Sequence, residues 1–169
     1  EGVRVATLRS AGNIEYFYGN SAVSKSLCEA ALEVALRIGD RMTMAVCWRN
    51  IGDIVRNEGD LDTAAIHYEA GLAACRQTGD LWLMADITLR IGELDLLRRR
   101  LARARTYLEE SLALFTRLGD RRGAAMSADM LARLALAEGD YALARALLNE
   151  NIAAYRAVGD SHNLPLALL

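Results

Sequence analysis

The sequence contains little proline and few aromatic residues. One proline occurs among 169 residues, and Phe, Trp and Tyr together make up 6% of the chain. Proline breaks the interior of a helix, so its scarcity is compatible with long helices. Because 53% of the residues are hydrophobic while aromatics are few, we expect an all-α chain whose helices pack through small side chains.

Cysteine is scarce as well, and its spacing excludes two kinds of small scaffold. Cys28, Cys47 and Cys75 are odd in number and lack the CxxC spacing of zinc sites, so neither a disulfide framework nor a zinc clip is indicated. A reducing, cytoplasmic environment fits best. No apolar run reaches the about 20 residues that a membrane span needs. The chain begins at Glu1 with neither a signal-peptide charge pattern nor an initiator Met, and because the Met is missing we expect a fragment of a longer chain.

The chain also lacks a strong net charge. Twenty Lys and Arg residues oppose 22 Asp and Glu residues, which gives a net charge of -2. Such a balance provides no long-range attraction to nucleic acid or to an anionic membrane, so we expect neither as a direct partner.

The dipeptide Gly-Asp recurs on a grid of 20 residues. It occurs at positions 39–40, 59–60, 79–80, 119–120, 139–140 and 159–160, and the grid is broken at Gly19-Asn20 and at Arg99-Arg100. Glycine tolerates the left-handed conformation that ends a helix, and aspartate caps the amides that open the next one. The grid therefore predicts successive antiparallel helices.

Alternate helices resemble each other more than neighbours do, so the repeating unit is 40 residues long. This predicts a single solenoid domain with repeats 1–40, 41–80, 81–120 and 121–160, followed by the start of a further helix at 161–169. Small residues recur in register and predict close approach of helices. In first helices they are Gly12, Gly52, Gly92 and Ala132, and in second helices Ser24, Ala64, Ala104 and Ala144.

The residues of the second unit resemble the tetratricopeptide repeat family. The family pattern has a bulky residue before Leu-Gly, then a Gly-Asp turn, then an Ala. In this chain the segment Trp48 to Gly52, the turn Gly59-Asp60-Leu61 and Ala64 resemble these three parts in order. The resemblance implies an all-α, right-handed superhelical solenoid of antiparallel helix pairs. The common repeat has about 34 residues, so a 40-residue repeat implies longer helices.

The longer repeat is similar to two groups within that family. One comprises regulatory regions of large bacterial transcription regulators and signalling ATPases, including the maltotriose-responsive activator, and the other comprises animal cell-polarity adaptors. The Ala- and Arg-rich sequence of residues 110–122 resembles the bacterial group. This implies a non-catalytic module that binds a peptide or protein segment, with a small-molecule effector sensor as the alternative.

In this family the first helix of each pair lines a concave groove. The family's groove positions correspond here to Arg9, Asn13, Tyr16, Phe17, Arg49, Asn50, Asp53, Arg56, Asn57, Leu89, Arg90, Glu93, Leu96, Leu97, Asp129, Met130, Arg133 and Leu136. Amide and Arg donors can bind backbone carbonyls or carboxylates, so the groove suits a segment with apolar anchors and some acidic character. The alternative for the aliphatic positions is packing between repeats, whereas we favour the groove for Arg49 and Asn50.

One dense basic cluster contains Arg98, Arg99, Arg100, Arg103 and Arg105. It could contact phosphates, but a solvated turn whose arginines pair with neighbouring glutamates (Glu93, Glu109 or Glu110) is favoured. Because residue 99 is not glycine, we expect the turn between residues 97 and 102 to differ from the turn at 58–61.

No arrangement of residues indicates catalysis, a metal site or a cofactor. His67 and His162 are far apart, the spacing suggests no nucleophile or carboxylate around His67, and no glycine-rich phosphate loop occurs. The cysteines are expected to be buried as small hydrophobic residues. Pro165 suits the first turn of a further helix, so we expect either a continuing chain or end-to-end self-association.

Overall fold

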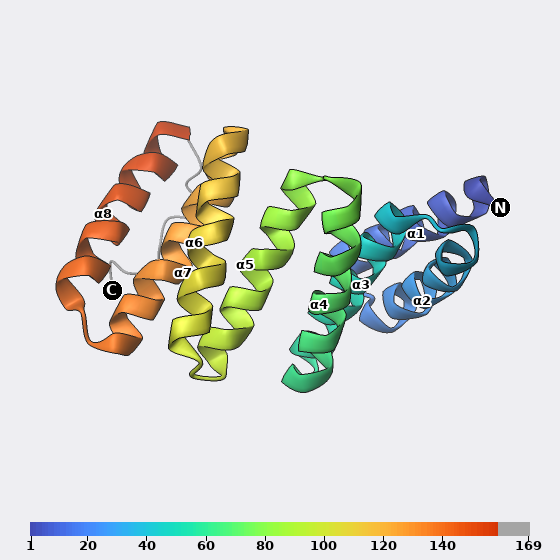
Figure 1. The fold of residues 1–169 in the computed structure, drawn as a ribbon, viewed down its shortest axis with the longest axis horizontal. Helices are drawn as coiled ribbons and strands as arrows, with labels where there is room; N and C mark the ends of the chain where they lie inside the picture. The colour runs from blue at the N-terminus through green and yellow to red at the C-terminus, as the bar shows by residue number, and fades with distance from the viewer. Residues whose placement is uncertain (159–169) are drawn as a thin grey trace. The chain divides into compact units, whose positions relative to one another are not determined.

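The computed structural model describes residues 1–158, with side chains described through Ile152. Eight helices and no strands occur in this part, so the chain is all-α as predicted (Figure 1). The helices are α1 (Gly2–Phe17), α2 (Ser21–Ile38), α3 (Arg41–Asn57), α4 (Leu61–Thr78), α5 (Leu81–Leu97), α6 (Leu101–Leu118), α7 (Arg121–Glu138) and α8 (Tyr141–Val158). None of these described helices is both long enough and apolar enough to cross a membrane.

The Gly-Asp dipeptides act as the sequence predicts. Gly39 ends α2 in the left-handed conformation with φ 73°, and Asp40 accepts a hydrogen bond of 3.0 Å from the Thr43 amide at the start of α3. Gly79 and Asp80 repeat this arrangement between α4 and α5. Each of these two dipeptides therefore ends one helix and caps the next, which keeps the connections short.

The turn at Arg99 corrects one prediction. Arg99 adopts the left-handed conformation with φ 60°, and its amide donates to the Leu96 carbonyl at 3.0 Å. At the register-equivalent turn the Gly59 amide donates to the Arg56 carbonyl, also at 3.0 Å. The expectation of an altered turn was wrong, because the chain accepts the conformational cost of a non-glycine residue there and keeps the repeat geometry.

The chain divides inside α5 into two compact units, residues 1–87 and residues 88–169. In the first unit α1 pairs with α2, α3 pairs with α4, α2 packs against α3, and α1 also contacts α3. In the second unit α7 packs against both α6 and α8. Within each unit, sequential helices are therefore neighbours, as expected of stacked helix pairs. The predicted fifth repeat, 161–169, lies outside the described residues.

Glycines in the first helices create the close approach that the sequence predicts. A Cβ on Gly52 would lie 2.6 Å from the Tyr68 ring, and one on Gly92 would lie 2.6 Å from Leu108. Carbon atoms in contact are normally about 3.5–4.0 Å apart. The large side chain of the second helix therefore fills the space that the missing Cβ leaves, and it locks the two helices of a pair together.

Candidate partner-binding surface

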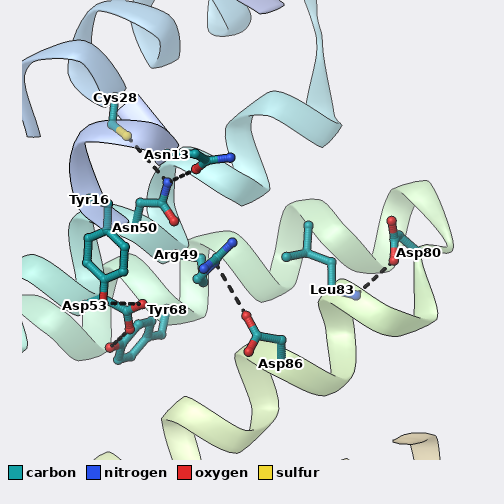
Figure 2. A network of polar contacts seen from close by, with 10 residues as sticks. All are labelled: Asn13, Tyr16, Cys28, Arg49, Asn50, Asp53, Tyr68, Asp80, Leu83 and Asp86. Atoms are coloured by element: carbon teal, nitrogen blue, oxygen red, sulfur yellow. Dashed lines mark hydrogen bonds and ion pairs between the residues drawn. The ribbon is translucent and has the colours of Figure 1, made fainter. Parts of the chain in front are cut away.

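A polar network connects the first helices of the first two helix pairs (Figure 2). The Asn50 side chain in α3 donates a hydrogen bond to Asn13 Oδ1 in α1. The same amide lies 3.7 Å from Cys28 Sγ in α2. Asn50 is only 1% exposed, so its carboxamide joins three helices from inside the fold.

Asp53 forms the second part of this network. It accepts a hydrogen bond of 2.7 Å from the Tyr68 hydroxyl of α4 and a longer one of 3.4 Å from the Tyr16 hydroxyl of α1. In Figure 2 the two phenol rings lie on either side of the carboxylate. Asp53 is fully buried, and hydrogen bonds of this kind compensate a carboxylate for the water it has lost.

An ion pair extends the polar contacts to the start of α5. Arg49 Nε lies 3.5 Å from Asp86 Oδ2, and both side chains are largely buried. This pair follows the same spacing as the amide and phenol contacts, because each joins residues 37 positions apart in consecutive first helices. The three pairs are Asn13–Asn50, Tyr16–Asp53 and Arg49–Asp86.

The predicted groove residues of the first unit differ in exposure. Asn50 and Asp53 are buried, so the expectation that they line an accessible groove does not hold for these two side chains. Phe17 and Asn57 are exposed, and the remaining five are half-buried, namely Arg9, Asn13, Tyr16, Arg49 and Arg56. We refer to the exposed and half-buried members, from Arg9 to Asn57, as the first-helix face.

The predicted groove residues of the second unit differ in the same way. Leu89 is buried, which agrees with packing rather than with an accessible position. Leu97, Arg133 and Leu136 are exposed, whereas Arg90, Glu93, Leu96, Asp129 and Met130 are half-buried. Arg133 Nε lies 2.9 Å from Asp129 Oδ2 one helical turn away, so this arginine is already paired within α7.

The basic cluster after α5 is largely neutralised by acidic neighbours. Arg103 Nε lies 2.9 Å from the buried Asp95 carboxylate, and Arg100 lies 3.8 Å from it. Arg105 pairs with Glu109 at 3.7 Å and with Glu138 of α7. These contacts favour the interpretation of a turn whose arginines pair with neighbouring acidic groups.

Burial and neighbouring groups shift the pKa values of the cysteines and of His67. Cys28 and Cys47 are fully buried, as predicted. A hydrogen bond from Cys47 lowers the pKa of the Cys28 thiol to about 7 against the opposing effect of burial, and the same contact raises the pKa of Cys47. Burial, reinforced by Lys25, lowers the pKa of the half-buried His67. Within the described residues, no three His, Cys, Asp or Glu side chains are grouped to hold a metal ion.

Two acidic residues of this surface were absent from the sequence predictions. Asp86 binds Arg49, and Asp95 binds Arg103. The 37-residue spacing between consecutive first helices could have identified Asp86, because it lies that distance after Arg49. No comparable spacing rule pointed to Asp95, whose partner follows eight residues later across a turn.

Comparison with known proteins supports this architecture. Residues 83–157 match the model of the tetratricopeptide repeat family. We found no match among curated protein sequences. Among solved structures, the apo form of RapI superposes with a TM-score of 0.85 at 12% identity, covering 93% of this chain and 57% of RapI.

Two further structures have the same fold. A Rap protein complexed with competence and sporulation factor has a TM-score of 0.83 at 16% identity, covering 93% of this chain and 44% of the Rap protein. A kinesin light chain from Podosopora anserina with nearly identical TPR-like repeats has a TM-score of 0.74 at 16% identity, covering 99% of this chain and 82% of that chain.

The class of protein follows from the helix pairs and from these similarities: the fold is a tetratricopeptide-like solenoid. The predicted resemblance to the tetratricopeptide repeat family is thereby confirmed. The chain spans only about half the length of the two Rap proteins to which it is similar.

Proposed function

We propose that this chain is a non-catalytic interaction module that binds a protein or peptide segment on its first-helix face. The observation that carries the proposal is the row of polar side chains on α1 and α3, which fixed hydrogen bonds hold in place. Rigid, preorganised side chains lose little entropy when they bind a partner, so such a row suits recognition.

The character of the partner follows from the charges and the exposed groups. The first-helix face contains Arg9, Arg49 and Arg56, of which Arg49 is paired with Asp86. Phe17 at the end of α1 is strongly exposed and offers an apolar contact. We therefore propose a segment with apolar anchors and some acidic character, whose backbone polar groups meet the amides of the face, and we expect its affinity to fall as the salt concentration rises.

The similarities support a binding role without naming a partner. A structurally similar Rap protein is described in complex with competence and sporulation factor. A solenoid of helix pairs exposes a long continuous surface, because each repeat contacts only its neighbours. The 40-residue repeat length further supports a place within a larger bacterial regulator in the cytoplasm. The sequence on either side of this chain would test that context.

The binding test uses peptides selected from a displayed library. The affinity of a selected peptide is measured by fluorescence anisotropy for the unchanged chain and for a Phe17→Ser, Asn57→Ala double variant. Both side chains are exposed, so the fold should persist. We expect the double variant to bind at least about ten-fold more weakly, which corresponds to about 1.4 kcal/mol.

The matched control is Ile66→Ser, which removes an exposed apolar side chain from the second helix α4. It should leave the affinity unchanged. Selection of no peptide at all, or of peptides that respond to Ile66→Ser but not to the double variant, would contradict the proposal. A thermal-shift screen of metabolites tests the alternative of a small-molecule effector, because a ligand that binds only the native state raises Tm.

A further inference from the structure

A row of side chains at equivalent repeat positions runs along one side of each first helix, and its exposure to solvent differs in α1. In α3, α5 and α7 every member of the row is buried, whereas in α1 Val3 is 83% exposed and Ile14 is 53% exposed. The buried rows are Thr43, Cys47, Ile51 and Ile54; Leu83, Ile87, Ile91 and Leu94; and Gly123, Ser127, Leu131 and Leu134. The corresponding row of α1 is Val3, Thr7, Ala11 and Ile14.

In α3 and α7 this row lies on the side that meets the preceding second helix. Helix α3 packs against α2, and α7 packs against α6. The Gly123 position of the row illustrates the contact, because a Cβ there would meet the Phe115 ring of α6 at 2.3 Å. The bare row of α1 therefore has the shape that receives the second helix of a preceding pair.

Helix α8 is a second helix, and its Asn151 has an incomplete set of hydrogen bonds. Asn151 is 3% exposed, and its Nδ2 donates to the Ala125 carbonyl at 2.8 Å. Its Oδ1 is buried and has no hydrogen-bond partner within the described part of the chain. A buried acceptor without a partner carries a substantial free-energy cost, so a donor supplied from outside would stabilise it.

The repeat register identifies that donor. Ser111, at the equivalent position of α6, bonds at 2.9 Å to Ser127, which lies sixteen residues later. Sixteen residues after Asn151 is position 167. The equivalent position in the first repeat, four 40-residue repeats earlier, is Thr7. Its hydroxyl donates to the Val3 carbonyl just as Ser127 donates to the Gly123 carbonyl. Rotation of the Thr7 hydroxyl would let it donate to Asn151 instead.

A second pair of positions agrees with the same register. Lys25 pairs with Glu58, and Arg105 pairs with Glu138, in both cases 33 residues later and between a second helix and the following first helix. The same count from Arg145 in α8 leads to Tyr18, which is strongly exposed at the end of α1. A guanidinium over a tyrosine ring is a favourable contact.

The face that would receive α1 is hollowed and apolar. Three alanines of α7, at positions 124, 125 and 128, line a pocket together with Leu112 and Asn151. In α3 the position equivalent to residue 128 is occupied by Trp48, so α7 leaves a space that a neighbouring helix can fill. Arg121 and Glu150 also line this pocket and add one charge of each sign.

We propose that copies of this chain associate end to end, with α1 of one copy packed on the α7–α8 face of the next in the register of the internal repeat. Thr7 then meets Asn151, and Tyr18 meets Arg145. The contact joins two different surfaces, so each copy keeps one free surface that can bind a further copy. It rests on residues other than those of the first-helix face and is therefore separable from peptide binding.

The first test is sedimentation velocity on the intact chain over a range of concentrations. We expect the mean mass to rise with concentration, and Ile14→Glu to weaken the association at least ten-fold. The control Ile66→Glu places the same charge on an exposed position of α4 and should leave association unchanged. Peptide binding measured at low protein concentration should survive Ile14→Glu, which separates this surface from the first-helix face.

The second test distinguishes unlike surfaces from a symmetric contact. Ala128→Glu blocks the α7–α8 pocket, and Arg145→Glu is a second variant at an exposed position of the same end. A mixture of Ile14→Glu with either variant should form a defined dimer that neither forms alone, because each partner keeps one intact surface. Circular dichroism confirms that the variants fold.

Three outcomes would overturn the proposal. One is a chain that stays monomeric up to about millimolar concentration, with or without residues 159–169. Another is association only after removal of residues 159–169, which would mean that the chain's own last residues cover the α7–α8 face. The third is association that Ile14→Glu leaves intact.

Discussion

Replacing Arg99 with glycine should stabilise the protein, although it removes a charged side chain and adds no contact. Arg99 is held at φ 60° in the turn that joins α5 to α6. The left-handed conformation costs a residue with a Cβ about 1–2 kcal/mol, and glycine avoids this cost. Glycine also gives the unfolded chain more freedom, which opposes the gain by about 0.4–1 kcal/mol. We expect a net stabilisation of about 0.5–1 kcal/mol.

The measurement is thermal and urea unfolding of matched variants. For a chain of this size 1 kcal/mol shifts Tm by about 2–4 °C, so Arg99→Gly should raise Tm by roughly 1–4 °C. Arg99→Ala removes the guanidinium but keeps the Cβ, and it should give no gain. Gly59→Ala makes the reverse change at the equivalent turn, where a Cβ would meet no atom within 4 Å, so its cost is conformational rather than steric.

The comparison between Arg99→Gly and Arg99→Ala shows whether the left-handed backbone at position 99 carries a free-energy cost. If Arg99→Gly is no more stable than Arg99→Ala, the left-handed backbone carries no measurable cost and the reasoning is refuted. If Gly59→Ala leaves Tm unchanged, the same conclusion follows from the second turn.

Three further predictions concern the first unit. Gly52→Ala forces a Cβ to within 2.6 Å of the Tyr68 ring, and we expect a loss of about 1–2 kcal/mol in urea unfolding even though alanine favours helix; an unchanged midpoint would show that the ring moves freely. Tyr68→Phe removes the 2.7 Å hydrogen bond to buried Asp53 and should cost about 1–3 kcal/mol, whereas a neutral result would mean that water replaces the hydroxyl. The pKa of His67 should lie below about 6.5 in an NMR titration because burial and Lys25 disfavour the imidazolium, and Lys25→Ala should raise it. The neutral form is the one that the fold favours, so the stability contributed by His67 is present at neutral pH and is lost as the pH falls through its folded pKa.

Much of the fold could be predicted from the sequence because local chemistry determines it. A glycine followed by an aspartate at the 20-residue spacing ends one helix and starts another, and Gly39-Asp40 behaves as this rule requires. Gly52-Asp53 lies off that spacing and stays inside α3. The close approach at Gly52 was predictable for a similar reason. Glycine destabilises the interior of a helix, so a glycine that recurs in register there indicates close helix packing.

The surface was less predictable because burial depends on partners far away in the sequence. Asn50 looked like an accessible donor, yet it lies between α1, α2 and α3, with Asn13 and Cys28 as neighbours. Arg49 looked like a free cation, and its partner Asp86 lies on another helix. At Arg99 a local rule failed for the opposite reason, since the packing of the helices on either side outweighs the preference of one residue.

The three polar pairs between consecutive first helices bear on how the chain avoids misassembly. The apolar rows of successive repeats are so alike that a helix pair could stack one repeat out of place and still bury its hydrophobic surface. The polar pairs differ: amide with amide, phenol with carboxylate, guanidinium with carboxylate. A stack displaced by one repeat would leave buried donors and charges facing the wrong groups, at a cost of several kcal/mol. These contacts therefore favour the stack in which each repeat lies beside its native neighbour, and they disfavour misfolded stacks of a repetitive sequence.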